Sequence, residues 1–191
     1  MSGILIGVDK AAYTKQSITD KTELPNDMVS GGTGTYADWS TSTSSDAWVK
    51  LITSGGANIR LTMDTTDIES DVVTVVEGVV LSGSNIEVEL NLNKIDANVW
   101  ADLLGATASS GGFDVPATYN ALPIVNFAVV SRTVDGKHFL IWFKKAVAIL
   151  NGDGSTDNAG EYKYTITFRA VADYETDGTP KPVVYLEEVS V

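Results

Sequence analysis

The chain has 191 residues and a formal net charge of −12 at pH 7, and 43% of its residues are hydrophobic. A chain of this length buries about 70% of its unfolded surface, so it can fold as one domain without disulfides or structural metals. It has no cysteine and one histidine, His138, which excludes thiol chemistry and leaves little for a metal site or a Ser-His-Asp triad. We therefore expect a protein that is not an enzyme, with no catalytic residue, metal or cofactor.

The acidic residues are unevenly spread. Between Asp64 and Asp102 nine acidic residues stand against one base, Lys94, so this segment carries −8. Proteins that grip nucleic acid need clustered Lys and Arg, whereas the three arginines of this chain are scattered. We expect no direct adhesion to nucleic acid. The acids serve either solubility or a surface that repels DNA.

The N-terminal region predicts no signal peptide, because its apolar stretch is confined to residues 4–8 and no basic region precedes it. We expect a soluble protein made in the cytoplasm. A Ser/Thr/Gly-rich loop is predicted at about 30–57. Tyr36, Trp39 and Trp48 favour a loop that docks onto another subunit, because flexible linkers rarely carry aromatic residues.

Residues 58–92 show the patterns of β-strands. The stretches 58–64 and 85–92 alternate apolar with polar residues, and 71–81 is an almost continuous β-branched run in which Gly78 suits a bulge. The acidic stretch 64–71 could attract calcium, but an exposed loop before a strand is the simpler interpretation.

Two glutamates of this region are candidates for catalytic acids. Glu87 and Glu89 are two residues apart, so they share one face of a strand and repel each other, whereas glycoside hydrolysis needs two acids across a cleft. The pair suits an acidic surface better than an acid/base pair. Glu187 and Glu188 are also neighbours in the sequence.

The glycine-rich stretch SGGTGT at residues 30–35 is not a phosphate loop, because it lacks the lysine and the helix that such a loop needs.

One segment has helical periodicity. At about 93–105, Ile95, Val99 and Leu103 repeat every four residues, with Asn93 as the expected N-cap and Gly105 as the expected C-terminal cap. We expect one amphipathic helix that lies across a sheet face or an open end. A second long loop is predicted after it, at 106–122.

The stretch from Pro123 to Asp173 predicts a large β-hairpin. Its strand at 137–150 is apolar on both faces from Phe139 to Phe143, so it lies between two layers of one chain or at a sheet shared with neighbouring copies. His138 has a structural role in this strand. The polar loop 151–161 loosely matches a calcium loop, but a hairpin connection explains it better.

A last strand is predicted at 182–189, with Pro182 restricting its start to an edge or a strand end. The whole chain, 1–191, is thus expected to form a single, mainly β domain. Its architecture is an antiparallel β-sandwich or part-barrel with one flanking α-helix and long loops.

The stretch 123–173 resembles the tail tube (major tail) proteins of long-tailed bacteriophages. The resemblance lies in a turn at 134–137, an aromatic strand that ends in Lys144-Lys145-Ala146-Val147, a Gly/Asp loop, and a strand that ends at 167–173. It implies a virion protein, made in the host cytoplasm, that assembles as stacked hexameric rings. It also implies tape-measure, tail terminator and baseplate or tail-tip proteins as partners, and an acidic lumen that conducts DNA without binding it.

On this interpretation Glu87 and Glu89 face the lumen, while Ile86, Val88 and Leu90 face the core. The loop from Ser30 to Trp48, with Tyr36, Trp39 and Trp48, then contacts the next ring. The alternative is a carbohydrate-binding or adhesive β-sandwich module in which these three aromatic residues stack on a sugar. A hydrolase is the third alternative, disfavoured by the single histidine and the absence of cysteine.

Overall fold

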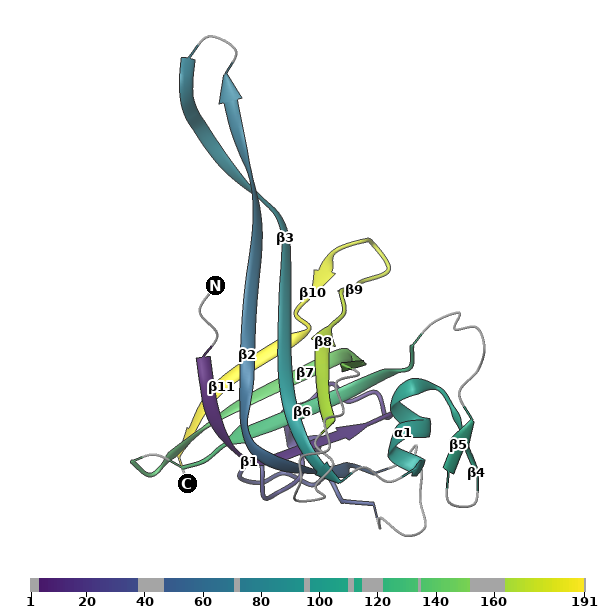
Figure 1. Cartoon of the computed structure of the whole chain (residues 1–191). Helices are drawn as coiled ribbons and strands as arrows, with labels where there is room; N and C mark the ends of the chain where they lie inside the picture. The colour runs from purple at the N-terminus through teal and green to yellow at the C-terminus, as the bar shows by residue number, and fades with distance from the viewer. Residues whose placement is uncertain are drawn as a thin grey trace, which may run out of the picture.

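The protein is built mainly of antiparallel β-strands with one α-helix (Figure 1). The computed structural model describes residues 4–37, 47–70, 73–94, 97–109, 112–114, 122–133, 135–151 and 164–190. Six strands pair in the order β7–β6–β1–β2–β3–β8, and β8 pairs back with β7. The six are β1 (Ile4–Thr14), β2 (Val49–Ser70), β3 (Val73–Lys94), β6 (Ile124–Ser131), β7 (Lys137–Asn151) and β8 (Tyr164–Ala170).

The pairing of β8 with β7 closes the sheet into a six-stranded barrel. The prediction of a mainly β protein with one helix is confirmed, but the sheet forms a closed barrel rather than a sandwich. Strand β7 makes closure possible because it is long enough to have two successive neighbours. Its second half pairs with β8 from Ala146↔Ala170 to Asn151↔Thr165. Its first half pairs with β11 (Val184–Ser190), an additional edge strand.

The predicted hairpin of residues 123–173 is confirmed in its pairing. Strands β6 and β7 pair with each other, and in the connection between them Asp135 and Gly136 both have positive φ, a conformation that Asp and Gly adopt more readily than most residues. Of the two alternatives for β7, cover within one chain is the one that the structure shows. Each part of β7 has partners within its own chain: β6, β11 and β8.

Two apolar clusters explain why β7 is apolar on both faces. Ile141 and Phe143 face the barrel interior, where Phe127 stacks on Phe168 with ring centroids 3.9 Å apart. Leu140 and Trp142 face outward into a second cluster. The outer cluster is covered by the segment after β1 and by the residue just before β2. The side chains that cover it are Ile18, Leu24, Met28, Val29 and Trp48.

The segment that covers the outer cluster folds back on itself closely. Pro25 bridges to Gly34, and a Cβ added at Gly34 would lie 2.4 Å from the carbonyl oxygen of Glu23. Only glycine fits at such a backbone approach. A short 3-10 turn, η1 (Lys21–Glu23), is capped by Asp20 in the same segment.

The α-helix α1 spans Ala97–Leu104, which is shorter than the predicted 93–105. Asn93 belongs to β3 and cannot cap the helix. The predicted C-terminal cap is confirmed: Gly105 has φ +65°, and the N–H of Ala106 donates to the carbonyl of Ala101 at 3.0 Å. No α-helix in the described part of the chain is long and apolar enough to cross a membrane.

Helix α1 packs on the barrel through Val99 and Leu103, which join the interior cluster. Its Asp102 is 95% buried at the side chain and forms an ion pair with Lys15, just after β1, while Tyr13 donates a hydrogen bond to the other carboxylate oxygen at 3.3 Å. The predicted loop after the helix contains a short hairpin instead, β4 (Thr107–Ser109) and β5 (Gly112–Asp114). A comparable small hairpin, β9 (Asp173–Tyr174) and β10 (Pro180–Lys181), precedes β11.

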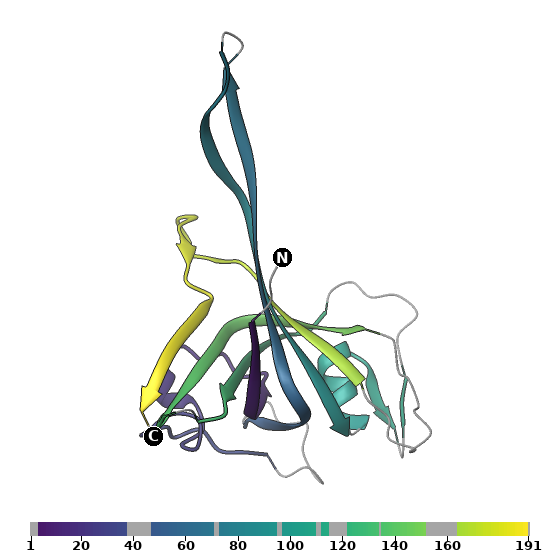
Figure 2. The same ribbon diagram turned by 60° about the vertical axis from the view of Figure 1, so that its left-hand side comes forward.

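The longest element is the β2–β3 hairpin, which stands out from the barrel in both views (Figures 1 and 2). Strand β2 pairs with β1 only as far as Ile59, and β3 pairs with β8 only from Glu87 onward. The acidic stretch predicted as a loop at 64–71 is part of β2 up to Ser70. The predicted loop at 30–57 ends earlier, because β2 begins at Val49.

The Asp102 contact yields a stability prediction. Replacing Asp102 with Ala removes the carboxylate that satisfies the buried Tyr13 hydroxyl and the Lys15 amine, and should lower the free energy of unfolding by about 2 kcal/mol. Urea denaturation measures this change. The matched control is Glu175→Ala, which removes an exposed ion pair with Lys181 and should cost less than about 1 kcal/mol. Equal effects of the two substitutions would contradict this role for Asp102.

Candidate functional site

The outer part of the β2–β3 hairpin, here called the ribbon, comprises Arg60–Ser70 of β2 and Val73–Ile86 of β3. In the ribbon the two strands pair only with each other among the described residues, from Leu61↔Ile86 near its base to Ser70↔Val73 near its tip. At about 3.3 Å per residue, the β2 arm extends roughly 30 Å beyond the barrel. Among the described residues, no strand pairs with either outer edge of the ribbon.

The sequence of the ribbon accounts for its form. The β3 arm contains the β-branched run VTVV and VV on either side of Glu77 and Gly78, which favours an extended backbone. The pairing register shifts between Ile68 and Glu69, where Ile68 pairs with Gly78 and Glu69 with Val76. The residue left out of the register is Glu77, which lies next to Gly78, the position at which a bulge was predicted. Such bulges increase the right-handed twist, and the two arms cross visibly in Figure 1.

A two-stranded ribbon of this length is an unusual element for a protein to expose. An isolated hairpin is marginally stable in water, because it has few neighbours against which to bury its side chains. Its outer edges also offer rows of backbone N–H and C=O groups to any passing strand. The ribbon is therefore suited to pairing with another chain.

The ribbon is acidic. Between residues 61 and 86 the sequence has five acidic residues and no base, which are Asp64, Asp67, Glu69, Asp71 and Glu77. Sequence reasoning missed the ribbon because this acidic stretch is polar enough to suggest a loop. The signal that could have identified it was the absence of Gly, Pro and Asn between Arg60 and Val76, since hairpin turns usually contain those residues.

At the base of the ribbon, Glu87 and Glu89 lie on the outer face of the barrel. Val88 and Leu90 between them are fully buried in the interior cluster, and Ile86 packs against that cluster. The core-facing half of the prediction is thus confirmed. The orientation of Glu87 and Glu89 toward a lumen stays a prediction.

Glu87 is paired with a base on the neighbouring strand. The Arg169 Nε donates to Glu87 Oε1 at 2.6 Å, and Arg169 lies directly across from Glu87 in the β3–β8 register. The Glu87 side chain is only 16% exposed and that of Arg169 is 46% exposed. The outer face here is therefore mixed in charge rather than uniformly acidic.

The three aromatic residues predicted to contact another ring have different surroundings. Trp48 is 1% exposed in the outer cluster, and its Nε1 donates to the carbonyl of Glu23 at 3.0 Å. Its indole is thus already used within its own chain. Tyr36 is half-buried, donates to Asp27 at 2.7 Å and lies beneath the Lys50 amine. Trp39 falls outside the described residues.

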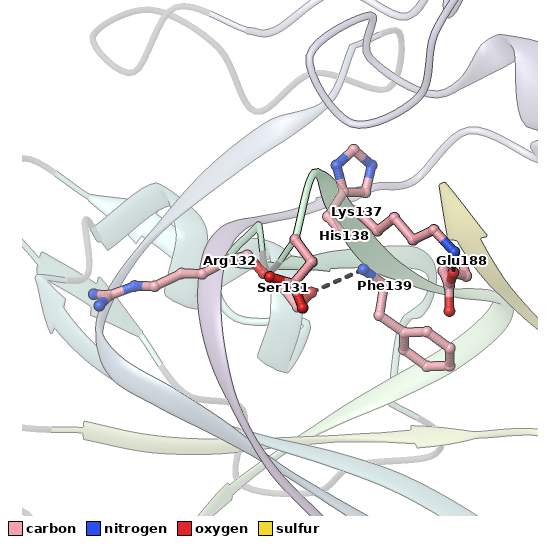
Figure 3. A pocket seen from close by; sticks show the side chains of 7 residues that line it. Ser131, Arg132, Lys137, His138, Phe139 and Glu188 are labelled. Atoms are coloured by element: carbon pink, nitrogen blue, oxygen red, sulfur yellow. Dashed lines mark hydrogen bonds and ion pairs between the residues drawn. The ribbon is translucent and has the colours of Figure 1, made fainter. Parts of the chain in front are cut away.

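His138 lies beside a hollow of about 460 Å³ at the β6–β7 turn (Figure 3). The side chains around it do not converge: Arg132 points away from the Lys137–Glu188 ion pair, and the Phe139 N–H donates to Ser131 Oγ at 2.8 Å. The His138 Nε2 is buried and has no partner among the described residues. Among those residues, no group of three or more His, Cys, Asp or Glu side chains could hold a metal ion. Most of the polar loop 151–161 lies outside the described residues.

Strand β11 presents the other outer edge of the sheet, and ion pairs hold it in place. Lys21 donates to both carboxylate oxygens of Glu187 at 3.1 Å, and the Tyr185 hydroxyl donates to Glu187 at 2.8 Å. These hydrogen bonds from Tyr185 and Lys21 lower the pKa of Glu187 below its ordinary value. Glu188 pairs with Lys137 on the neighbouring strand.

Comparisons with known proteins give little further information. No protein-family model and no curated protein sequence matches the chain. A solved structure described as that of a type six secretion system protein is similar over 95% of each chain, with 9% sequence identity and a TM-score of 0.33. We therefore build the proposed function on the geometry of this chain.

The Glu87–Arg169 pair yields a second prediction. In a double-mutant cycle with Glu87→Gln and Arg169→Ala, the coupling energy should be about 1 kcal/mol, because Glu87 is largely shielded from water. The same cycle on the exposed pair Lys137 and Glu188 should give less than about 0.5 kcal/mol. Denaturant titrations of the four proteins in each cycle measure both values. A larger coupling in the exposed pair would be the contrary result.

A third prediction concerns pH. Because the pKa of Glu187 is lowered in the folded state, its contribution to stability is complete above its ordinary value of 4.5 and is lost as the pH falls below it. Hydrogen exchange of the β11 amides, corrected for intrinsic rates, should show weaker protection at about pH 3 than at about pH 6. Glu187→Gln should reduce this difference. An unchanged pH response in that variant would rule Glu187 out as its source.

Proposed function

We propose that this protein is a structural subunit that assembles with copies of itself through the ribbon. The observation that carries the proposal is the ribbon itself, which extends beyond the barrel with no strand on either edge among the described residues. A closed barrel has few edges of its own to offer. Backbone pairing on the ribbon is therefore the most direct way for one copy to join another.

The form of assembly that we propose is a tube of stacked, hexameric rings, as in the phage tail tubes that residues 123–173 resemble. The subunit would then be a virion protein made in the host cytoplasm. Tape-measure, tail terminator and baseplate or tail-tip proteins would be its partners. A barrel whose strands close on themselves is a rigid unit for such a lattice, and the net charge of −12 keeps single copies soluble.

In this tube the lumen would conduct DNA during ejection without binding it. Glu87 and Glu89 remain our candidates for the lumen face, since their strand neighbours Val88 and Leu90 fix them on the outside of the barrel. Like charge on the wall and on the phosphates would prevent adhesion. Arg169 offsets part of that charge at Glu87.

The carbohydrate-binding alternative gains no support from the aromatic residues proposed for it. A sugar platform needs ring faces open to solvent, whereas Trp48 is buried in the outer cluster and Tyr36 is half-buried beneath Lys50. No observation on the described residues favours this function over self-assembly.

Removing the ribbon tests the proposal. Replacing residues 61–86 with Asn-Gly joins the paired residues Arg60 and Glu87 by a two-residue turn and leaves the barrel strands intact. The variant should fold, with a cooperative denaturant transition, and should stay monomeric at concentrations where the wild type forms rings or tubes. Negative-stain microscopy and analytical ultracentrifugation measure the difference.

Two results would overturn the proposed function. One is a wild-type protein that remains monomeric at every concentration. The other is a ribbonless variant that folds and still forms the same rings, because assembly would then use a different surface.

A further inference from the structure

A groove of about 500 Å³ lies on the barrel surface, outside the ribbon. It is bounded by residues 17–19, by the middle of β7, and by the C-terminal segment 173–183. Three lysines line it: Lys144, Lys145 and Lys181. We call it the lysine groove.

The lysines of the groove retain donors for a further ligand. Lys145 pairs with Asp173 at 2.5 Å and Lys181 pairs with Glu175 at 3.2 Å, and each lysine side chain is more than a third exposed. The Lys144 amine lies 5.1 Å from the centre of the Trp142 ring and is absent from the ion pairs among the described residues. Since each ammonium has three donors, both ion pairs leave capacity for another carboxylate.

The charge of the groove contrasts with that of the chain. Its lining has three lysines and two acidic residues, so it is net positive, while the chain as a whole carries −12. Two such copies repel each other at long range. Contact between them is favoured only where a locally basic surface meets an acidic one.

The ribbon is the matching acidic surface. Its two strands carry four acidic residues, Asp64, Asp67, Glu69 and Glu77, against one base, Arg60. It also extends away from the body (Figures 1 and 2), so it is placed to reach a groove on another copy. A contact between two different surfaces of identical chains is heterologous, and such contacts repeat into rings or filaments.

We propose that the lysine groove receives the acidic ribbon of a second copy of this chain. This inference rests on the proposed function and specifies its receptor surface. On docking, the Lys144 amine gains carboxylate partners. The Lys145 and Lys181 amines then share their hydrogen bonds between Asp173, Glu175 and the incoming ribbon. Backbone pairing extends the contact along the ribbon, and the groove fixes the position of the acidic stretch.

Charge reversal on each side provides the test. A groove variant, Lys144→Glu with Lys181→Glu, and a ribbon variant, Asp64→Lys with Asp67→Lys and Glu69→Lys, which makes residues 61–86 net positive, are each examined alone and as an equimolar mixture. Alone, each should need a concentration at least about tenfold above that of the wild type to assemble, because like charges then meet at every contact. In the mixture, each ribbon meets a groove of opposite charge, so assembly should return toward the wild-type concentration.

The matched control is Lys10→Glu with Lys137→Glu, which changes the net charge by the same amount outside the groove. It should assemble much closer to the wild-type concentration than the groove variant. Circular dichroism and denaturant titration establish that each variant folds, and ultracentrifugation and microscopy measure assembly.

The outcomes separate the two proposals. If the groove variant assembles as the control does, or if the folded mixture fails to assemble, the groove is not the receptor, although ribbon-dependent assembly of the wild type still stands. If the wild type itself never assembles, the proposed function fails. Rescue in the mixture establishes the groove and the ribbon as partners.

Discussion

The structure depends on how its β-strands satisfy their backbone hydrogen bonds. An extended strand exposes a row of N–H and C=O groups on each side, and leaving them without partners is costly away from water. The barrel meets this requirement by pairing β8 with the second half of β7, which removes both ends of the sheet at once. The first half of β7 pairs with β11, so outer edges remain at β11 and along the ribbon. The proposed function rests on those edges.

Packing divides the molecule into a rigid part and an extended part. The barrel has an interior cluster and an outer cluster on either side of β7, and α1 is fixed to it by Asp102 with Lys15 and Tyr13. The ribbon extends beyond the barrel, and among the described residues its outer strands pair only with each other. An element of that kind gains most of its stability from a partner. In the proposed assembly, its acidic sequence favours a partner surface that is locally basic.

The sequence predicted the barrel better than it predicted the ribbon. The strict alternation at 85–92 and the continuous apolar runs at 124–131 and 137–150 arise because burial determines which positions are apolar. These strands can therefore be recognised from the sequence. Barrel closure depends on the distant pairing of β7 with β8 and could not be read from local periodicity. The acidic residues of the ribbon suggested a loop at 64–71, whereas this stretch belongs to β2 up to Ser70. Trp48 was placed on the surface because its neighbours are polar, whereas its contacts come from the segment around Leu24 and Met28.

The central claim is that the edges of the ribbon pair with a second copy. Hydrogen exchange of the ribbon amides, measured on dilute monomer and on assembled protein, tests it most directly. Barrel amides should be protected in both samples. We predict that ribbon amides exchange rapidly in the monomer and become protected on assembly. Assemblies that form while the ribbon amides continue to exchange as in the monomer would contradict the account.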